Sequence, residues 1–324
     1  MLRVGPNPYG LTYTLGIQGQ SPAPRDALWF TNLAEEMGAA SIEFHYHHVA
    51  ALSDAQIEQL KGRLTRAEIQ PVISGPWPID CLAQGFDLAI RLGVKVIRTH
   101  LSPVLSGDRS DNAFDWNEIV KKIRTEMPLL GRKFADAGLT LAIEDHQDFG
   151  SWDLLEFAEL GGASVGICFD TGNPLAVAED PIAFAHRVAD KVRHVHLKDY
   201  RAHFTAEGYR LVRCPIGDGA VPLAEIAEIL NARQPGLTAT LEPGAHFARH
   251  IRLRSPDWWN GYDLNAGLEV DTCLQTAMRN CLPESDDWRT PVERGEPDAA
   301  VCQYERLQME RSVENMKKLG WLRK

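Results

Sequence analysis

The sequence predicts an α/β protein built on a (β/α)8 TIM barrel with a C-terminal extension. Short runs rich in β-branched residues recur eight times over about 245 residues, and a helix-like stretch follows most of them. A strand that alternates with a helix about eight times over such a length is typical of this barrel. A doubly wound open sheet is the alternative, but no GxGxxG motif follows the first run. The number of runs therefore favours the barrel.

The expected strands are short, and their successive starts lie 25 to 45 residues apart. They begin at Leu11, Ser41, Ile69, Val94, Leu139, Ser164, Val192 and Leu237. Amphipathic patterns between them predict helices over residues 25–37, 54–66, 117–137 and 223–231. Ser53 is a suitable N-cap for the second of these helices, and Gly38, Gly93 and Gly138 each follow a helical stretch.

Two stretches interrupt the alternation of strands and helices. Residues 102–116 form a polar loop after the fourth strand, and the chain after Glu242 loses its periodicity until a final helix expected over 299–319. We therefore expect a barrel domain over residues 1–249 and an extension over 250–324 packed on it. The segment WWNGY at 258–262 is expected to form a lid or a dimer contact, or to pad the outside of the barrel, because exposed aromatic residues favour interfaces.

Composition narrows the class of protein. The chain has 324 residues, a formal net charge of −10, and no apolar stretch of about eighteen residues that would span a membrane. The acidic balance argues against nucleic-acid binding. Its six cysteines form no CxxC pair and are too sparse for a disulfide framework, and the N-terminal residues lack a charged-then-apolar leader. We expect a mature cytoplasmic protein with reduced cysteines.

Polar side chains gather at the expected carboxyl ends of the strands, where barrel enzymes carry their chemistry. Residues two apart share a face of a strand. On this parity the candidates are Glu43, His45, His47, Arg98, His100, Glu144, His146, Asp170, His194, His196, Lys198 and Glu242. Each one taken alone is compatible with an ordinary loop or surface residue. Three carboxylates and one imidazole converging from strands five to eight repel one another unless a cation lies among them. Oxygen-rich ligation with one His suits Mn²⁺ or Mg²⁺, with Co²⁺ or Zn²⁺ as alternatives.

Four of these segments, in this order and spacing, resemble the xylose isomerase-like superfamily of sugar isomerases and epimerases. They are LAIEDH at 141–146, CFDTGN at 168–173, VHLKD at 195–199 and LEPG at 241–244, and the similarity covers residues 10–245. The superfamily includes ketose 3-epimerases, hydroxypyruvate isomerases, inosose dehydratases and, more distantly, the endonuclease IV group. The resemblance implies that Glu144, Asp170, His196 and Glu242 hold one divalent metal ion, with Glu144 and Glu242 as the catalytic base and acid.

The substrate contacts follow from the same resemblance and from strand parity. Arg213, just before PIGDG, is similar to an Arg that holds substrate oxygens in the family, and Asn173 stands where many relatives have His. The full set of expected substrate-binding residues is His45, His100, His146, Asn173, Lys198 and Arg213. On strand parity the basic residues Arg98, His100, Lys198, His45 and His47 face the pocket, which would suit a substrate that carries a carboxylate, or alternatively a phosphate.

The leading hypothesis is a metal-dependent isomerase or epimerase of a small sugar or sugar derivative, which stabilises an enediolate. A lyase that decarboxylates or dehydrates a sugar acid, such as a 3-oxo aldonic acid, is the principal alternative. Endonuclease IV-type repair requires additional His ligands, and the third strand ends without one. A fourth hypothesis is a non-catalytic barrel that binds a ligand but has lost its activity. The intact set of four metal-ligating residues argues against it. The expected partners are a small carbohydrate or sugar acid and further copies of the chain, as a dimer or tetramer, with neither nucleic acid nor membrane.

Overall fold

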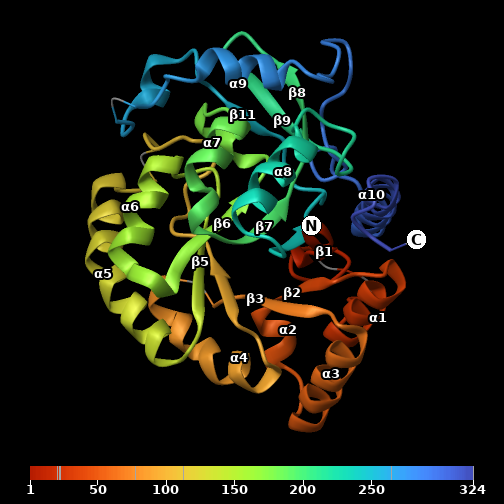
Figure 1. Ribbon diagram of the computed structural model, residues 1–324. Helices are drawn as coiled ribbons and strands as arrows, with labels where there is room; N and C mark the ends of the chain where they lie inside the picture. The colour runs from red at the N-terminus through yellow and green to blue at the C-terminus, as the bar shows by residue number, and fades with distance from the viewer. Residues whose placement is uncertain (20, 22, 77, 112, 264, 324) are drawn as a thin grey trace.

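The computed structural model describes residues 1–19, 21, 23–76, 78–111, 113–263 and 265–323. Within them, eight parallel strands form a nearly closed barrel with helices around its outside (Figure 1). The strands are β1 (Arg3–Pro6), β2 (Ser41–His45), β3 (Gln70–Ser74), β4 (Val96–Thr99), β5 (Thr140–Glu144), β6 (Val165–Asp170), β7 (Val192–Leu197) and β10 (Thr238–Leu241). Their order is β1-β10-β7-β6-β5-β4-β3-β2. The predicted fold class is confirmed.

The barrel closes where β1 meets β2. The amide of Ala40 donates to the carbonyl oxygen of Val4 over 2.8 Å. A Cβ atom at Gly5 would lie 1.6 Å from the carbonyl oxygen of Ser41, so any side chain on Gly5 would force the two strands apart. Glycine is therefore required in the middle of β1, although glycine has a low propensity for β-strands.

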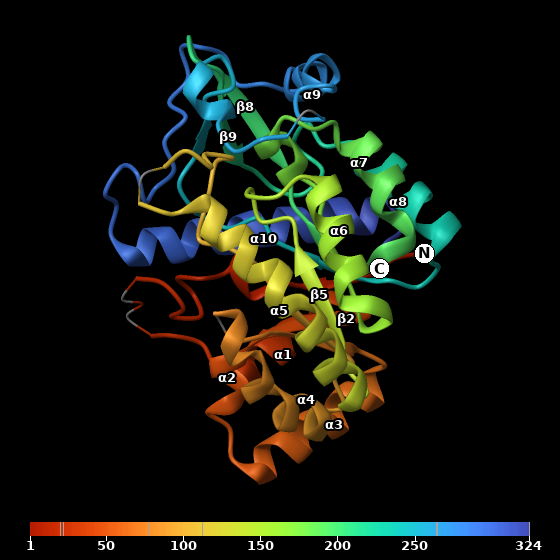
Figure 2. The same cartoon turned by 90° about the vertical axis from the view of Figure 1, so that its left-hand side faces the viewer.

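Helices follow the strands around the barrel: α1 (Ala27–Met37), α2 (Tyr46–Ala50), α3 (Asp54–Ala67), α4 (Phe86–Leu92), α5 (Trp116–Asp136), α6 (Ser151–Gly161), α7 (Pro181–Val188) and α8 (Leu223–Arg233). The four helices predicted from periodicity are confirmed to within two residues at each end. The Ser53 cap is confirmed by a reciprocal pair of hydrogen bonds with Gln56. Figure 2 shows α5 and α6 side by side, where Gly131 allows close approach to the carbonyl of Gly161.

The first strand is a correction to the sequence prediction, because β1 spans Arg3–Pro6 and the run that begins at Leu11 forms turns. The carboxylate of Glu305 fixes these turns. It accepts hydrogen bonds from the hydroxyl of Thr12 (3.1 Å), from the amides of Tyr13 (3.0 Å) and Thr14 (2.9 Å), and from the hydroxyl of Thr14 (2.9 Å). This carboxylate comes from nearly 300 residues away and overrides the strand propensity of the run.

A small antiparallel sheet follows the seventh barrel strand and was not predicted. It contains β8 (Tyr200–Phe204), β9 (Tyr209–Arg213) and β11 (Arg249–Ile251), in the order β11-β9-β8. Because β8 begins three residues after the end of β7, this sheet lies at the carboxyl end of the barrel strands, at the top in Figure 1. Its strands alternate between one buried and one more exposed face.

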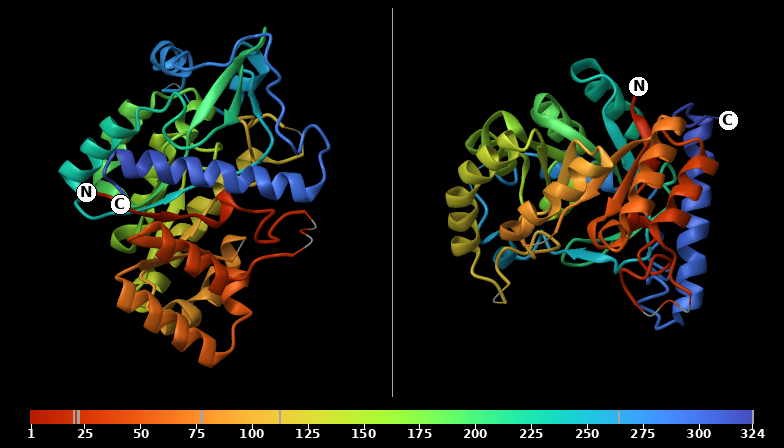
Figure 3. Two further views of the ribbon diagram at one scale, coloured as in Figure 1. Left: turned by 90° about the vertical axis from the view of Figure 1, so that its right-hand side faces the viewer. Right: turned by 90° about the horizontal axis from the view of Figure 1, so that it is seen from below.

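The C-terminal segment contains α9 (Val270–Ala277), next to the small sheet, and the long helix α10 (Asp298–Lys318). Figure 3 shows α10 beside the N-terminal segment, and the helix predicted over 299–319 is confirmed. The Ser312 hydroxyl and the Asn315 amide of α10 also hydrogen-bond the backbone of Ile216. The division at residue 249 stays a prediction. No helix among the described residues is long and apolar enough to cross a bilayer.

The two stretches that interrupt the alternation pack on each other. The Trp258 indole is fully buried and donates to the carbonyl oxygen of Ser106 over 2.9 Å, and the Tyr262 hydroxyl donates to that of Gly107 over 2.8 Å. Arg109 stacks on Tyr262 at 4.0 Å and on Trp116 at 4.7 Å. The expectation of exposed aromatic side chains in 258–262 is therefore wrong for Trp258, which packs within the chain. A lid or dimer role for the segment stays a prediction.

Candidate metal centre and substrate cavity

Four side chains from consecutive barrel strands converge at the carboxyl end of the barrel. Glu144 ends β5, Asp170 ends β6, His196 lies in β7, and Glu242 follows β10. One potential ligand atom from each lies within 4.8 Å of the others, and all four residues are buried. The resemblance gave this set of four, and the parallel sheet brings them together because its strands end at one edge.

Glu43 of β2 contacts the imidazole of His196. It is the main polar residue of this site outside the predicted metal-ligating and substrate-binding residues. Its Oε2 atom lies 2.7 Å from Nε2 of His196 and 3.0 Å from Nε2 of His194. This leaves Nδ1 of His196 facing Glu144 Oε1 at 3.2 Å and Glu242 Oε2 at 2.9 Å. Carboxylates commonly fix the second nitrogen of a metal-binding imidazole in this way. The parity of β2 placed Glu43 inward but did not indicate its partner.

Arg98 of β4 links Glu43 to the cluster. Its Nε lies 3.2 Å from Glu43 Oε1, and its Nη1 lies 3.1 Å from Glu144 Oε2. Burial favours the neutral form of a carboxyl, yet His196 and Arg98 hold the pKa of Glu43 well below its usual range. Against the same burial, Arg98 and His196 lower the pKa of Glu144. Both glutamates are therefore ionised at neutral pH.

Two further cations contact the outer side of the cluster. The Lys198 ammonium pairs with Asp170 and lies 2.9 Å from Glu242 Oε1, which also lies 3.2 Å from Arg213 Nη1. Burial disfavours the Lys198 charge, but Asp170 and Glu242 raise its pKa above the ordinary value. Burial likewise would raise the pKa of Glu242, but Lys198 and His196 hold it well below its usual range.

Asp199 explains the last residue of the VHLKD motif. Its carboxylate accepts hydrogen bonds from the amides of Gly217 (3.0 Å), Gly219 (2.9 Å) and Val221 (3.0 Å), and thus fixes the PIGDG loop. A Cβ atom at Gly219 would lie 2.1 Å from Asp199 Oδ1, so the loop can wrap this carboxylate only with glycine there. The fixed loop follows Arg213 directly and holds the end of β9 over the cluster.

A cavity of about 250 Å³ opens over the cluster. Its described wall consists of Tyr9, Gln18, Arg98, His100, Leu105, Glu144, His146, Gln147, Lys198, Arg213, Glu242, His246 and Arg249. Four of the six predicted substrate-binding residues belong to it: His100, His146, Lys198 and Arg213. The rings of His100 and His146 lie 4.8 Å apart, and burial lowers their pKa values to about 3 and about 4. Both imidazoles are neutral at physiological pH and suited to hydrogen-bonding hydroxyl groups.

The other two predicted contacts lie outside this described wall. The amide of Asn173 is occupied inside the protein: Nδ2 donates to the carbonyl oxygen of Asp145 over 2.7 Å, and Oδ1 accepts from the Tyr200 hydroxyl over 3.1 Å. The ring of His45 packs edge-on against Tyr9 at 6.0 Å, and burial lowers its pKa to about 4. Their roles in substrate binding stay predictions.

Sequence reasoning missed Tyr9, His246 and Arg249 in the wall. His246 and Arg249 follow the LEPG motif closely, which was the available signal. The amide of Tyr9 donates to Asn7 Oδ1 over 2.8 Å and its hydroxyl contacts Ser74 of β3 over 2.8 Å, and no local pattern indicated the second contact.

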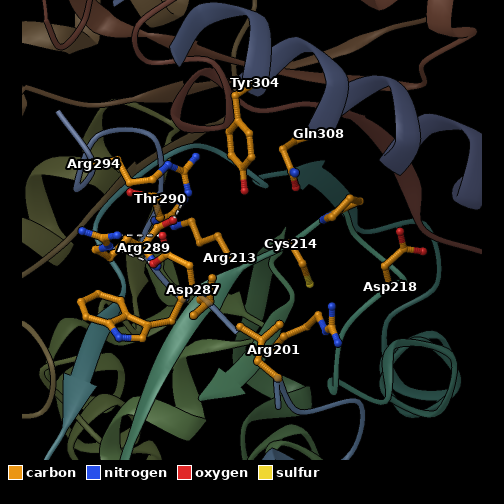
Figure 4. Close-up of a pocket in the computed structure, with 14 residues that line it drawn as sticks. Arg201, Arg213, Cys214, Asp218, Asp287, Arg289, Thr290, Arg294, Tyr304 and Gln308 are labelled. Atoms are coloured by element: carbon orange, nitrogen blue, oxygen red, sulfur yellow. Dashed lines mark hydrogen bonds and ion pairs between the residues drawn. The ribbon is translucent and has the colours of Figure 1, made fainter. Parts of the chain in front are cut away.

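An outer pocket of about 300 Å³ lies beside the small sheet, bounded also by residues 282–294 and by α10 (Figure 4). Arg213 borders both hollows. The other arginines of the outer pocket have internal partners: Arg201 donates to the carbonyl oxygen of Asn280, Arg289 pairs with Asp287, and Arg294 pairs with Glu296. The charges of Arg289 and Arg294 are therefore compensated by carboxylates, and Arg201 is held by backbone carbonyl oxygens.

Comparison with known proteins agrees with this geometry. The family model described as "xylose isomerase-like TIM barrel" matches residues 31–260. The chain belongs to the xylose isomerase-like TIM barrel family. The match spans the barrel strands from β2 to β10, the small sheet and all four residues of the cluster.

Two curated relatives of this chain are named as enzymes. A 3-oxo-isoapionate decarboxylase of Pectobacterium atrosepticum is 25% identical over 239 residues, covering 71% of this chain and 82% of its own. An inosose dehydratase of Clostridium beijerinckii is 30% identical over 105 residues, but these cover only 31% of this chain and 34% of the dehydratase. Among solved structures, the IolI protein with a bound zinc atom has a TM-score of 0.54 at 15% identity, covering 86% of this chain and 96% of IolI. That likeness concerns the fold.

Proposed function

We propose that this protein is a divalent-metal-dependent lyase that removes CO₂ from a 3-oxo sugar acid. The observation that carries the proposal is the charge pattern of the cavity. Two carboxylates of the cluster, Glu144 and Glu242, line the cavity, and its wall also carries Arg98, Lys198, Arg213 and Arg249. A pocket so lined suits a substrate with oxygen atoms for a metal ion at one end and an acid group at the other.

In this proposal Glu144, Asp170, His196 and Glu242 hold the metal ion. Three buried carboxylates with one imidazole fit a divalent cation. Oε2 of Glu144 and Oε2 of Glu242 accept no hydrogen bond from any described residue, although Arg98 and His196 lie at ion-pair distance. Oxygen-rich ligation favours Mn²⁺ or Mg²⁺, with Co²⁺ or Zn²⁺ as alternatives. When bound, such a cation supplies Lewis acidity to the oxygens of the substrate.

The chain's own residues supply binding and proton transfer. As the bond to the carboxylate breaks, its electron pair passes toward the 3-oxo group, and the carbon that lost CO₂ then takes a proton. Lys198 is the proposed proton donor, because its ammonium lies at the cluster between Asp170 and Glu242. The neutral imidazoles of His100 and His146 are proposed to hold the substrate's hydroxyl groups.

Decarboxylation suits this site better than proton shuttling between two glutamates. An epimerase needs one group to take a proton from carbon and another to return one. Here Glu144 and Glu242 would have to fill both roles while they ligate the proposed metal ion. Decarboxylation requires no initial C–H abstraction. The Pectobacterium decarboxylase, which matches 71% of this chain, supports the same choice.

Isomerisation or epimerisation of a sugar is the second candidate. The observation in its favour is that Glu144 and Glu242 both reach the cluster and both line the cavity. Two carboxylates so placed could act on the two faces of one substrate carbon.

One experiment separates these candidates. The protein with Mn²⁺ would be incubated in D₂O with 3-oxo sugar acids labelled with ¹³C at the carboxylate, and with ketoses and aldoses, and the products followed by NMR. We expect labelled bicarbonate, and one deuterium on the carbon that lost CO₂, from an acid substrate. Because 3-oxo acids decarboxylate spontaneously, reactions without protein and with Glu144→Gln serve as controls. Deuterium exchange with the carbon count unchanged would establish the isomerase instead, and loss of water would establish a dehydratase.

A further inference from the structure

One cation of the cavity wall differs from all the others. Arg98 pairs with Glu43 and Glu144, Lys198 with Asp170 and Glu242, and Arg213 with Glu242. Arg249 also lines the cavity, but its guanidinium makes no hydrogen bond or ion pair with any residue that the structure describes. A half-buried guanidinium without a hydrogen-bond acceptor carries a desolvation cost, and the carboxylate of Glu293 offsets that cost only in part.

The small sheet directs this side chain into the cavity. Arg249 is the first residue of β11 and pairs with the buried Leu211 of β9, so both lie on the face turned toward the barrel. The next pair along, His250 and Arg210, lies on the opposite face, where Arg210 stacks on Trp288 at 4.0 Å. The same sheet therefore presents one arginine to the cavity and one to its outer side.

Arg213 and His246 line the same cavity as Arg249. A Cβ atom at Gly244, which has a φ of +69°, would lie 3.0 Å from Arg213 Nη1 and 3.2 Å from Cδ2 of His246, so these two side chains meet over this glycine. Burial lowers the pKa of Arg249, and the charge of Arg213 lowers it further. The carboxylate of Glu293 opposes this shift.

We propose that Arg249, with Arg213 and His246, forms a subsite that binds the carboxylate of the substrate and selects acids over neutral sugars. A planar guanidinium binds a carboxylate through two parallel hydrogen bonds, and an oxyanion here would offset two neighbouring positive charges. The inference rests on the proposed function only in that the substrate is an acid. It concerns binding, so it can be tested without turnover.

The test compares binding of two unreactive ligands of equal length, the acid D-arabinonate and the neutral polyol D-arabinitol, by calorimetry with Mn²⁺ present. We expect the unaltered protein to bind the acid at least about 10-fold more tightly than the polyol. Arg249→Gln should weaken binding of the acid by about 10- to 100-fold and leave that of the polyol unchanged, with partial rescue in Arg249→Lys. Arg210→Gln is the matched control, because it removes an arginine from the outer face of the same sheet, and it should bind both ligands as the unaltered protein does.

Equal binding of the acid by the Arg249→Gln variant and the unaltered protein would overturn the subsite, as would an equal loss for both ligands. D-arabinitol 5-phosphate tests whether the subsite binds a phosphate instead of a carboxylate. If it binds more tightly than the acid and depends on Arg249, the carboxylate assignment is wrong. The thermal unfolding temperature without ligand checks folding, and we expect Arg249→Gln to match or exceed the unaltered protein. Selective binding of the acid without CO₂ release would remove the proposed function and leave the subsite in place.

Discussion

The interior of the barrel and the small sheet above it treat buried positive charge in opposite ways. In the barrel, Arg98 and Lys198 each contact two carboxylates and are almost fully buried. In the small sheet, Arg249 is half-buried and contacts no acceptor among the described residues. Both regions line one cavity. Arg213, at the end of β9, pairs with the carboxylate of Glu242, whereas Arg249 has no such partner among the described residues.

The difference separates the positioning of groups from the recognition of a ligand. A paired buried cation costs little while both partners are present and much when one is removed. An unpaired cation lowers stability and keeps its hydrogen-bond donors available for an oxyanion. On this view the barrel network sets the geometry of the cluster, and the small sheet determines which substrates bind.

The largest expected effect comes from the cluster itself. Glu144→Gln keeps the size of the side chain but removes a charge that the proposed metal ion requires. We expect turnover to fall by about 10³-fold or more and bound metal to fall below stoichiometry, as measured by elemental analysis of the purified protein. Retained metal and retained turnover together would exclude Glu144 from the site.

Arg98→Met tests the barrel side of the comparison. The substitution leaves Glu43 and Glu144 without their shared cation, and breaking such a buried pair costs about 3–5 kcal/mol of unfolding free energy. Urea unfolding measures the loss. The matched control is Arg91→Met, which removes an exposed ion pair with Asp54 and should cost much less than Arg98→Met. Equal losses in the two variants would show that the buried pairs of Arg98 contribute no more to stability than the exposed pair of Arg91.

Glu305→Ala tests whether α10 supports the cavity from outside the barrel. It would leave the amides of Tyr13 and Thr14 without their acceptor, at a cost of about 3 kcal/mol in urea unfolding. Because Tyr9 and Gln18 line the cavity on either side of these residues, ligand affinity should also fall. Unchanged affinity in the folded variant would show that the wall does not depend on α10.

A smaller effect is expected from pH. Burial raises the pKa of Asp148 to about 7, whereas the unfolded value is about 3.9. The folded protein then holds a proton that the unfolded chain has released, so stability falls as pH rises through this window. When the pH rises from 5 to 7.5, the unfolding free energy of the Asp148→Asn variant should fall by about 2 kcal/mol less than that of the unaltered protein. Parallel pH profiles of the two proteins would contradict this.

The sequence predicted the barrel because most of its strands and helices carry strong local patterns. It failed for β1, where Gly5 is needed for close approach to β2 and a distant carboxylate fixes the run after it. The small sheet left a readable signal, since Tyr200, Ala202 and Phe204 alternate with polar residues before a Gly-containing turn.

The candidate site divides in the same way. Glu144, Asp170, His196 and Glu242 lie at strand ends within motifs, so parity and resemblance together found them. Glu43 was placed inward, but its contact with His196 crosses 153 residues of sequence. For Arg249 the sequence offered only its closeness to the LEPG motif. Its orientation depends on the pairing of the three-residue strand β11 with β9.

The hold of Glu305 on residues 12–14 also sets the order in which the protein can be completed during synthesis. All eight barrel strands have been made once Leu241 has been added, yet Glu305 comes more than sixty residues later. Until α10, which carries Glu305, leaves the ribosome, the loop that bears Tyr9 and Gln18 lacks the carboxylate that fixes it. A nascent chain arrested before α10 would therefore carry the four cluster residues beneath an unfinished wall.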